Sequence, residues 1–278
     1  MILDHQKFSF KEKCLIEKVT VKAPFRFSVD FPDEACFIYF EEGNSKINSP
    51  YDQVKVSSQE SVLLKCGTYF SDLRVELKLD AYKIIVVHLP KNILKEIYVH
   101  EFPPVLTIRS TSDSIRKIES QELVGQFIKS LHFYFENPQL VSDELLSLKL
   151  KELILLLVNT ENLDTLSTLF QQLFTPQEID LREVVKQHLF SEISVNDLAF
   201  LCHMSVSTFK RQFKHVFNDT PANYFKTKRL EKAKELLAIS KLSISEIAYE
   251  TGFTDVGHFS KSFKSLYLST PSEYRLNQ

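Results

Sequence analysis

The side chains best able to do chemistry in this sequence are basic residues crowded into its last third. Residues 205–234 hold eight Lys and Arg side chains against two acidic ones, Asp219 and Glu231, a local net charge of +6. Ammonium and guanidinium groups bind phosphate oxygens, so this charge indicates a nucleic-acid surface. A solvated helix face carries similar charge, and charge alone leaves both interpretations open. The eight are Lys210, Arg211, Lys214, Lys226, Lys228, Arg229, Lys232 and Lys234.

The charge of the whole chain hides this concentration. The 278 residues carry 34 basic and 36 acidic side chains, a net charge of −2. Residues 175–278 hold 14 basic and 12 acidic side chains, a net +2, whereas residues 1–174 hold 20 and 24, a net −4. The apolar share of 44% is typical of a globular protein, and the length suggests two domains of ordinary size.

Most of these basic residues belong to the first copy of an internal repeat. The pattern LAF…FKRQFK over 198–214 returns as IAY…FSKSFK over 247–264, and TPANY at 220–224 returns as TPSEY at 270–274. The later anchors are offset by about 50 residues and the earlier ones by about 49, so the second copy has one extra residue in its turn. The chain therefore predicts the same structural unit twice.

Each copy begins with the signals that start a helix. Ser194 and Ser243 stand at the expected N-caps, with the acids Asp197 and Glu246 three residues later. The second pair is a capping box and the first is its weaker Asp version. Small residues follow within both helices, as close packing of one helix on another requires.

The rest of each copy completes a helix-turn-helix unit. Turns are expected at 203–205 and 252–254, each followed by a helix with basic and hydroxyl side chains on one face, which suits a major groove. Thr-Pro pairs at 220–221 and 270–271 predict the next helix starts. Between the copies, 222–239 reads as one helix of about 27 Å, close to the roughly 34 Å of one DNA turn. A slightly short spacer would bend the DNA.

These residues strongly resemble the DNA-binding domain of the AraC family of bacterial transcription regulators. The resemblance covers about a hundred residues and rests on ISVNDLAFLCHMSVSTFKRQFK (193–214), YFKTKRLEKAKELLA (224–238), ISEIAYETGFTDVGHFSKSFK (244–264) and TPSEYR (270–275). The family usually has glycine at the positions of Asn218 and Leu268. Asn tolerates a left-handed backbone and Leu tolerates it poorly, so a different or strained second turn is expected. Gly257 replaces a commonly polar residue and costs helix stability.

The resemblance implies a set of DNA-contacting residues. In the first unit Ser207, Lys210 and Arg211 occupy positions that read base edges, and Lys214 faces phosphate. The second unit places Val256, Gly257, His258 and Lys261 at the equivalent positions. Arg and Lys donate to guanine, and Val256 suits a thymine methyl. Arg211 is the strongest candidate. The aromatic residues of the repeat are expected in the core: Phe209, Phe213, Phe259, Phe263, Tyr224 and Tyr274.

The first half of the chain predicts an antiparallel sandwich or small barrel. Short apolar segments read as strands, separated by turns at 42–44 and 66–68. Together with the helical C-terminal region this gives an α+β fold, and the resemblance implies that the barrel is cupin-like. We expect a regulatory domain over 1–110, a helical dimerisation or linker region over 111–174 and the DNA-binding domain over 175–278. The strands are Leu15–Val21, Cys36–Glu41, Ser61–Cys66, Val75–Leu79 and Lys83–Leu89.

Helices are expected to dominate the middle of the chain. One short helix is predicted over 91–99, and the segment 100–104 then breaks the chain. Apolar residues from Ile115 to Phe135 predict a helix that ends at Asn137-Pro138. A second apolar stripe runs from Leu145 to Leu157, and a helix over 161–173 follows. These stripes fit a core or a subunit interface, and the helix around 115–136 is our candidate for dimerisation.

The resemblance also implies partners. They are double-stranded DNA, RNA polymerase, a second copy of the chain, and either a small effector among the Phe and Tyr residues of the barrel or a regulatory protein. Residues 100–104 and 148–153 resemble segments of family members that protein antiactivators control. Activation is the commoner outcome in the family. No membrane partner is expected, because the longest apolar run near mid-chain, Leu153–Val158, is far shorter than the roughly 20 residues of a membrane span.

An enzyme and a protein-binding adaptor are the alternative functions. The sequence has no HxH pair for a cupin metal, no GxSxG and no P-loop, so no catalytic residue, metal ligand or cofactor is expected. His88 and His100 are isolated and at most join a tertiary cluster. The four cysteines include no CxxC pair, and scattered thiols suit a reducing cytosol. The start of the chain lacks the apolar run of a signal peptide. Salt-sensitive retention on DNA separates the regulator from the adaptor.

Overall fold

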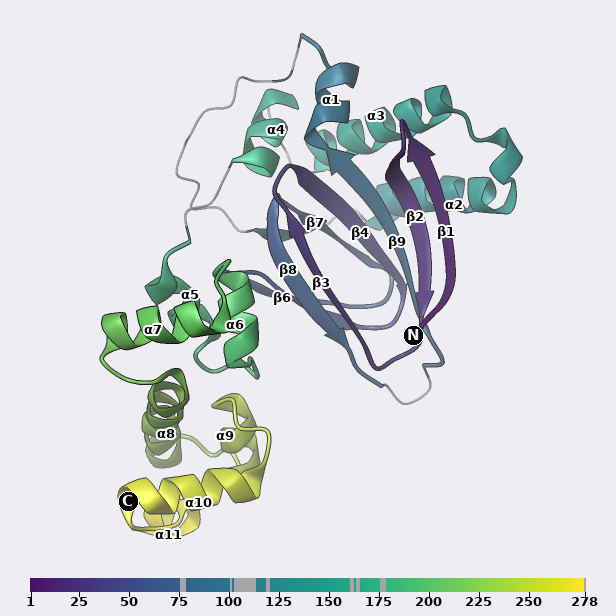
Figure 1. Ribbon diagram of the computed structural model, residues 1–278. Coiled ribbons are helices and arrows are strands. Elements are labelled where there is room, and N and C mark those ends of the chain that lie inside the picture. Colours follow the sequence, from purple (N-terminus) through teal and green to yellow (C-terminus); the bar gives the residue numbers. More distant parts are fainter. Residues whose placement is uncertain are drawn as a thin grey trace. The chain divides into compact units, whose positions relative to one another are not determined.

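The computed structural model describes residues 1–75, 79–100, 102, 114–118, 121–160, 163, 166–175 and 179–277. The chain forms two compact units, Met1–Glu178 and Ile179–Gln278. The first contains antiparallel sheets with helices and the second is helical, which confirms the predicted α+β class (Figure 1). The expected boundary at residue 110 falls outside the described residues, so our division of the first unit stays a prediction. None of the described helices combines the length and the apolar character that crossing a membrane requires.

Two antiparallel sheets build the first unit. The larger has the order β1-β2-β9-β4-β7-β10 and the smaller β3-β8-β5-β6. Apolar side chains of both sheets, among them Phe40, Val62 and Tyr69, form a shared core. The strands are β1 Ile2–Phe10, β2 Lys13–Val21, β3 Phe25–Phe31, β4 Glu34–Glu42, β5 Ser45–Asn48, β6 Gln53–Val56, β7 Glu60–Leu64, β8 Gly67–Leu73, β9 Tyr82–Pro90 and β10 Ile115–Lys117.

Four of the five predicted strands are present as β2, β4, β7 and β9. The fifth, 75–79, lies largely outside the described residues. The turn expected at 42–44 is also present, and Gly43 adopts φ +97° there. A Cβ at Gly43 would lie 2.3 Å from the Tyr82 ring, so both the backbone conformation and the space require glycine.

Helices cover the outer face of the larger sheet (Figure 1). A second core fills this interface, where the Phe37 ring of β4 meets the Phe127 ring of α2 edge to face at 6.4 Å between centroids. Figure 1 shows α2 and α3 running along the sheet. The elements are α1 Lys91–Ile97, α2 Gln121–Glu136, the short 3-10 helix η1 Pro138–Leu140, α3 Asp143–Thr160 and α4 Leu166–Phe174.

The start of the predicted 115–136 helix is wrong. Residues Ile115–Lys117 form β10, which pairs antiparallel with β7 so that Ile115 lies opposite Leu64. The helix itself is α2 and begins at Gln121. Its predicted end is confirmed, because α2 stops at Glu136, directly before Asn137-Pro138. The three residues of β10 are β-branched or basic and gain more from completing the sheet edge than from one further helical turn.

The second unit is a chain of seven helices (Figure 1). Paired phenylalanines form its cores, as expected: Phe209 and Phe213 are fully buried, and Phe259 and Phe263 are buried against Leu230 of the long helix. The helices are α5 Leu181–His188, α6 Val195–Leu201, α7 Val206–Phe217, α8 Pro221–Ile239, α9 Ile244–Glu250, α10 Val256–Tyr267 and α11 Pro271–Leu276.

Candidate nucleic-acid interface

Capping boxes fix the first helix of each helix-turn-helix unit. The Ser194 hydroxyl accepts from the Asp197 backbone N–H at 3.2 Å, and the Asp197 carboxylate accepts from the Ser194 N–H at 3.1 Å. Ser243 and Glu246 make the same reciprocal pair at 3.2 and 2.6 Å. The first box is therefore as complete as the second, although its sequence predicted a weaker version.

Replacing Ser243 with alanine is expected to lower the free energy of unfolding of the second unit by about 1 kcal/mol, because the Glu246 N–H loses its acceptor. Denaturant titration of the full chain measures this. Ser245→Ala, an exposed serine within the same helix, is the matched control and should change little. The backbone N–H of Ser243 lowers the pKa of Glu246, so the contribution of this carboxylate is present at neutral pH and fades as acid protonates it. Equal losses in both variants would contradict the capping role.

Tight turns carry the chain from the first helix of each unit into the second. His203 and Gly252 occupy them with φ of +52° and +86°. The buried Ala199 and Ala248 keep the helices close together, as expected from their size. Caps then start the second helices: Ser205 accepts from the Thr208 N–H at the start of α7, and Asp255 accepts from the His258 N–H at the start of α10. The second helix of each unit is thus held rigidly at its N-terminal end.

The second helices end in the same left-handed residue. Asn218 closes α7 with φ +54°, and Leu268 closes α10 with φ +62° and ψ +7°. A differently built second turn was one expectation; the observed turn instead keeps the left-handed geometry of the first turn, with a leucine in it. The Leu268 side chain is 88% exposed, so no burial offsets the strain of this conformation.

Leu268→Gly is therefore expected to raise the free energy of unfolding of the second unit by about 1 kcal/mol. Asn218→Gly, at the equivalent position of the first helix-turn-helix unit, is the comparison. It should change the free energy of unfolding by only a few tenths of a kcal/mol, because asparagine tolerates the left-handed region. Thermal and denaturant unfolding of the three proteins decides. A destabilised Leu268→Gly protein would show that the leucine contributes contacts that outweigh its backbone strain.

The candidate residues of the first helix-turn-helix unit share one face of α7. Ser207, Lys210, Arg211 and Lys214 are all exposed, and their spacing of three and four residues places them on the side opposite the buried Phe213. Within the described part of the chain, Lys210, Arg211 and Lys214 have no ion pair or side-chain hydrogen bond. Three cations and a hydroxyl are thus presented to solvent from one rigid helix.

The second helix-turn-helix unit presents a less charged face. Gly257 and Lys261 are exposed, and Val256 is partly buried against the core of this unit. His258 is exposed, and its ring lies 5.8 Å from that of Phe253. A Cβ at Gly257 would lie 3.2 Å from the Asp255 carboxylate that caps the helix, so its lack of a side chain leaves the cap undisturbed.

The basic residues of α8 are mostly engaged within the protein. Lys228 and Lys232 pair with acids three residues on, at 2.7 and 3.0 Å. The Lys234 ammonium lies over the Tyr267 ring at 5.1 Å. The +6 charge of 205–234 is therefore not a single surface, since the exposed cations without an ion pair or ring contact among the described residues lie on α7 and at Lys226.

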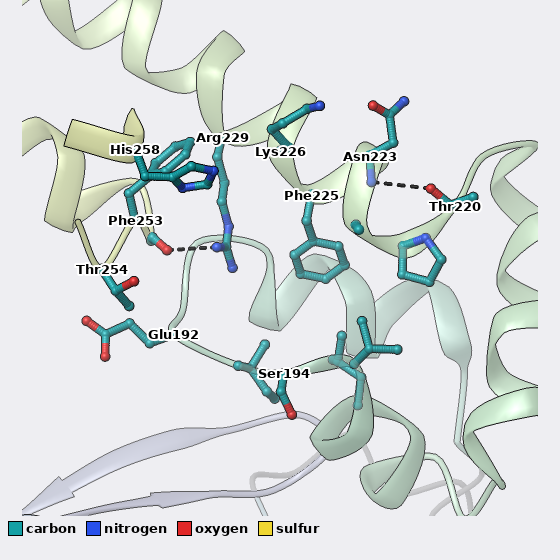
Figure 2. A pocket seen from close by; sticks show the side chains of 16 residues that line it. Glu192, Ser194, Thr220, Asn223, Phe225, Lys226, Arg229, Phe253, Thr254 and His258 are labelled. Atoms are coloured by element: carbon teal, nitrogen blue, oxygen red, sulfur yellow. Dashed lines mark hydrogen bonds between the residues drawn. The ribbon is translucent and has the colours of Figure 1, made fainter. Parts of the chain in front are cut away.

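Arg229 has a role that its sequence position did not reveal. Its guanidinium donates three hydrogen bonds to backbone carbonyls: to Leu189 at 2.8 Å, Ser191 at 2.6 Å and Gly252 at 2.7 Å. Figure 2 shows its side chain reaching from α8 toward the turn that holds Phe253. It lies at a cleft of about 790 Å³. The cleft is lined by the start of α6, the start of α8 and the turn before α10, and His258 is among its residues. Arg229 thus ties the segment before the first helix-turn-helix unit to the turn of the second helix-turn-helix unit, and its guanidinium is engaged within the protein.

Two family models match this chain. The helix-turn-helix domain model matches residues 198–277, and the ExsA N-terminal regulatory domain model matches residues 35–169. The virulence regulon transcriptional activator VirF of Yersinia enterocolitica is 25% identical over 222 residues, covering 78% of each chain. The HTH-type transcriptional regulator ExsA of Pseudomonas aeruginosa is 29% identical over 128 residues, covering 46% of each.

Other matches cover smaller shares. Histidine kinase P4 of Formosa agariphila is 27% identical over 212 residues, and the match spans 70% of this chain but only 16% of that protein. Among solved structures, the DNA-binding domain of AdpA in complex with a target DNA shares 29% identity over 35% of this chain and 87% of its own, with a TM-score of 0.33.

Proposed function

We propose that this chain, which belongs to the AraC family of helix-turn-helix regulators, binds specific sites on double-stranded DNA and controls transcription there. One observation carries the proposal: α7 presents Lys210, Arg211 and Lys214 on one solvent-facing side, without ion pairs in the described structure, from a helix fixed by caps at both ends. Such a helix fits a major groove. As a DNA-binding protein of a bacterial family it acts in the cytoplasm.

The DNA contacts divide into readers and phosphate ligands. We assign base edges to Ser207, Lys210 and Arg211 and phosphate to Lys214. In the second helix-turn-helix unit we assign Val256, Gly257, His258 and Lys261 to the adjacent major groove. The uncharged stretch Val256–Gly257 supports a weaker second reader, because it offers no side-chain hydrogen-bond donor to the bases. The His258 ring lies beside that of Phe253, which restricts the directions in which it can reach the DNA.

The long helix α8 sets the distance between the two readers. Its 19 residues span about 28 Å, somewhat less than the roughly 34 Å between major grooves one turn apart. Arg229 supports a fixed geometry because it joins backbone segments on both sides of α8. We therefore propose that both readers engage one face of the duplex and that the DNA bends toward the protein.

Retention on DNA at increasing salt tests the proposal against the adaptor alternative. If the four cations assigned to the DNA (Lys210, Arg211, Lys214 and Lys261) together displace about four counterions, the affinity of the full chain for duplex DNA should fall about 100-fold between 50 and 200 mM salt. Fluorescence anisotropy with a labelled duplex measures this. Binding that does not change with salt, or no binding at low salt, would favour an adaptor that uses its helices for protein contacts.

We assign control of this DNA binding to the first unit. The match of residues 35–169 to the ExsA N-terminal regulatory domain supports a regulatory role. The controlling partner is a small effector bound among the aromatic residues of the sheets or a regulatory protein. RNA polymerase is the proposed target at the promoter, with activation as the outcome, which the description of VirF as an activator supports.

Dimerisation through α2 and its neighbour α3 belongs to the same proposal. Apolar side chains remain exposed on these helices: Leu123 and Phe133 on α2, and Leu148 and Leu155 on α3, seven residues apart and so on one face. Light scattering of the purified chain should give twice the 32.3 kDa of one copy, and Leu148→Asp with Leu155→Asp should shift it toward one copy. A single-copy mass for the unmodified chain at working concentration would defeat this part.

A further inference from the structure

Ligand-type side chains meet on two neighbouring strands of the larger sheet. Cys36 on β4 lies directly opposite His88 on β9, and Glu34 lies opposite Pro90, two residues further along. Because residues two apart on a strand share a face, the three side chains Glu34, Cys36 and His88 point the same way, toward the core between the sheets. The Phe31 ring lies nearly perpendicular to the imidazole, with 6.4 Å between the ring centroids. A thiol, an imidazole and a carboxylate thus converge at one end of this core.

Two of the three distances within this group match the edges of a tetrahedron around a metal ion. The Cys36 Sγ lies 3.6 Å from His88 Nδ1 and 3.5 Å from Glu34 Oε1. A zinc ion with Zn–S near 2.3 Å and Zn–N or Zn–O near 2.1 Å has ligand-to-ligand distances of about 3.5 Å. His88 Nδ1 and Glu34 Oε1 lie closer together, joined by a short hydrogen bond whose proton a metal ion would replace. All three ligand atoms lie within 4.8 Å of one another.

We propose that Cys36, His88 and Glu34 bind a zinc-like divalent metal ion in the first unit. Thiolate and imidazole ligands together favour zinc over magnesium or calcium, which prefer oxygen. The Cys36 side chain is fully buried, whereas His88 and Glu34 keep 15% and 26% of their side-chain surface exposed, so an ion can enter from that side. Three protein ligands leave a fourth position for water or another ligand.

A further carboxylate holds the histidine in the orientation that this site needs. Glu17 on β2 accepts from His88 Nε2 at 3.1 Å, and Glu17 itself contacts His5 Nε2 at 2.6 Å. A metal-binding histidine usually donates its second ring N–H to a carboxylate in this way, which fixes the ring and leaves the other nitrogen for the metal. Glu17 is therefore a positioning residue of the proposed site.

Metal binding has a defined proton balance. The thiolate form of cysteine binds metal ions, so the Cys36 thiol gives up its proton when the ion binds. The ion displaces this proton and the one shared by His88 Nδ1 and Glu34, both released to solvent, and forms the sulfur, nitrogen and oxygen bonds. The site should therefore load more completely as the pH rises.

A second group, Cys14 with Glu17 and His88 Nε2, lies on the other side of the imidazole. A bulge in β2 between Cys14 and Ile16 turns Cys14 toward that side. The two nitrogens of the imidazole point in different directions, so they cannot bind the same ion, and the two groups are separate candidate sites. We choose the Cys36 side because its thiol is more deeply buried and because Glu17 already serves as the hydrogen-bond partner of Nε2. The two sides predict opposite cysteine dependence.

Cobalt titration of the full chain, purified without a histidine tag, tests the proposal. We expect one Co²⁺ per chain, with a near-ultraviolet thiolate-to-cobalt charge-transfer band that one equivalent of Zn²⁺ removes. Cys36→Ala should abolish the band, and Glu17→Gln should weaken metal affinity about 10–100-fold. Cys14→Ser and Cys66→Ser, thiols of the same unit, should retain it.

Circular dichroism separates loss of the site from loss of the fold. Glu34→Gln is the second test variant, because its partly exposed side chain keeps its size while it loses the charge that the metal requires, and it too should lose high-affinity binding. No thiolate band in the unmodified chain, a band that survives Cys36→Ala, or a band that Cys14→Ser removes would each overturn the proposal.

Discussion

Arg229→Ala is expected to lower the free energy of unfolding of Ile179–Gln278 by about 3–5 kcal/mol, which is enough to unfold many single domains. The substitution removes three charge-assisted hydrogen bonds, each worth about 1.5–3 kcal/mol, and leaves the carbonyls of Leu189, Ser191 and Gly252 without their partner. Water reaches part of the cleft and recovers some of this energy. Denaturant unfolding of the full chain, followed by amide exchange in each unit, should show the loss confined to the second unit.

Two matched substitutions control this result. Arg229→Lys keeps the positive charge but offers one nitrogen where three carbonyls are spread apart. Its loss of stability should be smaller than that of Arg229→Ala but still measurable. Lys226→Ala removes an exposed cation one turn earlier on the same helix and should change stability by less than about 0.5 kcal/mol. An Arg229→Ala protein as stable as Lys226→Ala would contradict the role of Arg229 as the link between the two helix-turn-helix units.

Arg211→Ala is expected to weaken binding to the specific DNA site by about 1–3 kcal/mol, or roughly 5- to 150-fold, and to relax the preference at one base pair. The guanidinium is exposed on α7 and has no ion pair within the described structure, so it is available for a bidentate contact with guanine. Titration of the site and of a scrambled duplex with the variant measures both effects.

Lys241→Ala is the control for charge, because it removes an exposed cation of the second unit that lies off both second helices. This variant should weaken binding to the specific and the scrambled duplex equally, and only slightly. Equal loss of affinity for both duplexes in Arg211→Ala would show that this side chain contacts phosphate alone, and the assignment of base reading would fail.

The second unit was predictable because its signals are local. The caps at Ser194 and Ser243, the Thr-Pro helix starts and the buried phenylalanines are all specified by residues within one or two helical turns of each other. A repeated pattern strengthened each of them. Leu268 shows the same logic, since two copies of one turn keep their geometry even where one copy has an unfavourable residue.

The first unit was predicted less well because its strands pair over long distances. The exposed β1 has little apolar alternation, and the alternating segment of β3 was not among the predicted strands. Ile115 reads as the start of an apolar helical stripe, yet its partner is Leu64, more than fifty residues away. In α2 the predicted apolar residues Phe127, Leu131 and Phe135 are buried. Leu123, predicted with them, is exposed, and its neighbour Val124 is buried in its place.

The residues of greatest interest share this dependence on distant partners. Arg229 looks like one more cation of a basic helix, and only the carbonyls that follow α5 and the one in the turn before α10 reveal its role. His88 was predicted to be isolated except for a possible tertiary cluster, and Cys14 and Cys36 were predicted to be scattered thiols. Strand pairing brings these three together, which no local spacing motif indicates.

Selection from a random DNA pool tests the central claim most directly. The full chain and residues 179–278 are each used to retain duplexes over several rounds. We predict an enriched site with two blocks about one helical turn apart, in which the block read by the first helix-turn-helix unit is more sharply defined. Arg211→Ala should lose the preference at one base pair. If neither protein enriches any shared sequence, the account of this chain as a site-specific DNA-binding regulator is contradicted.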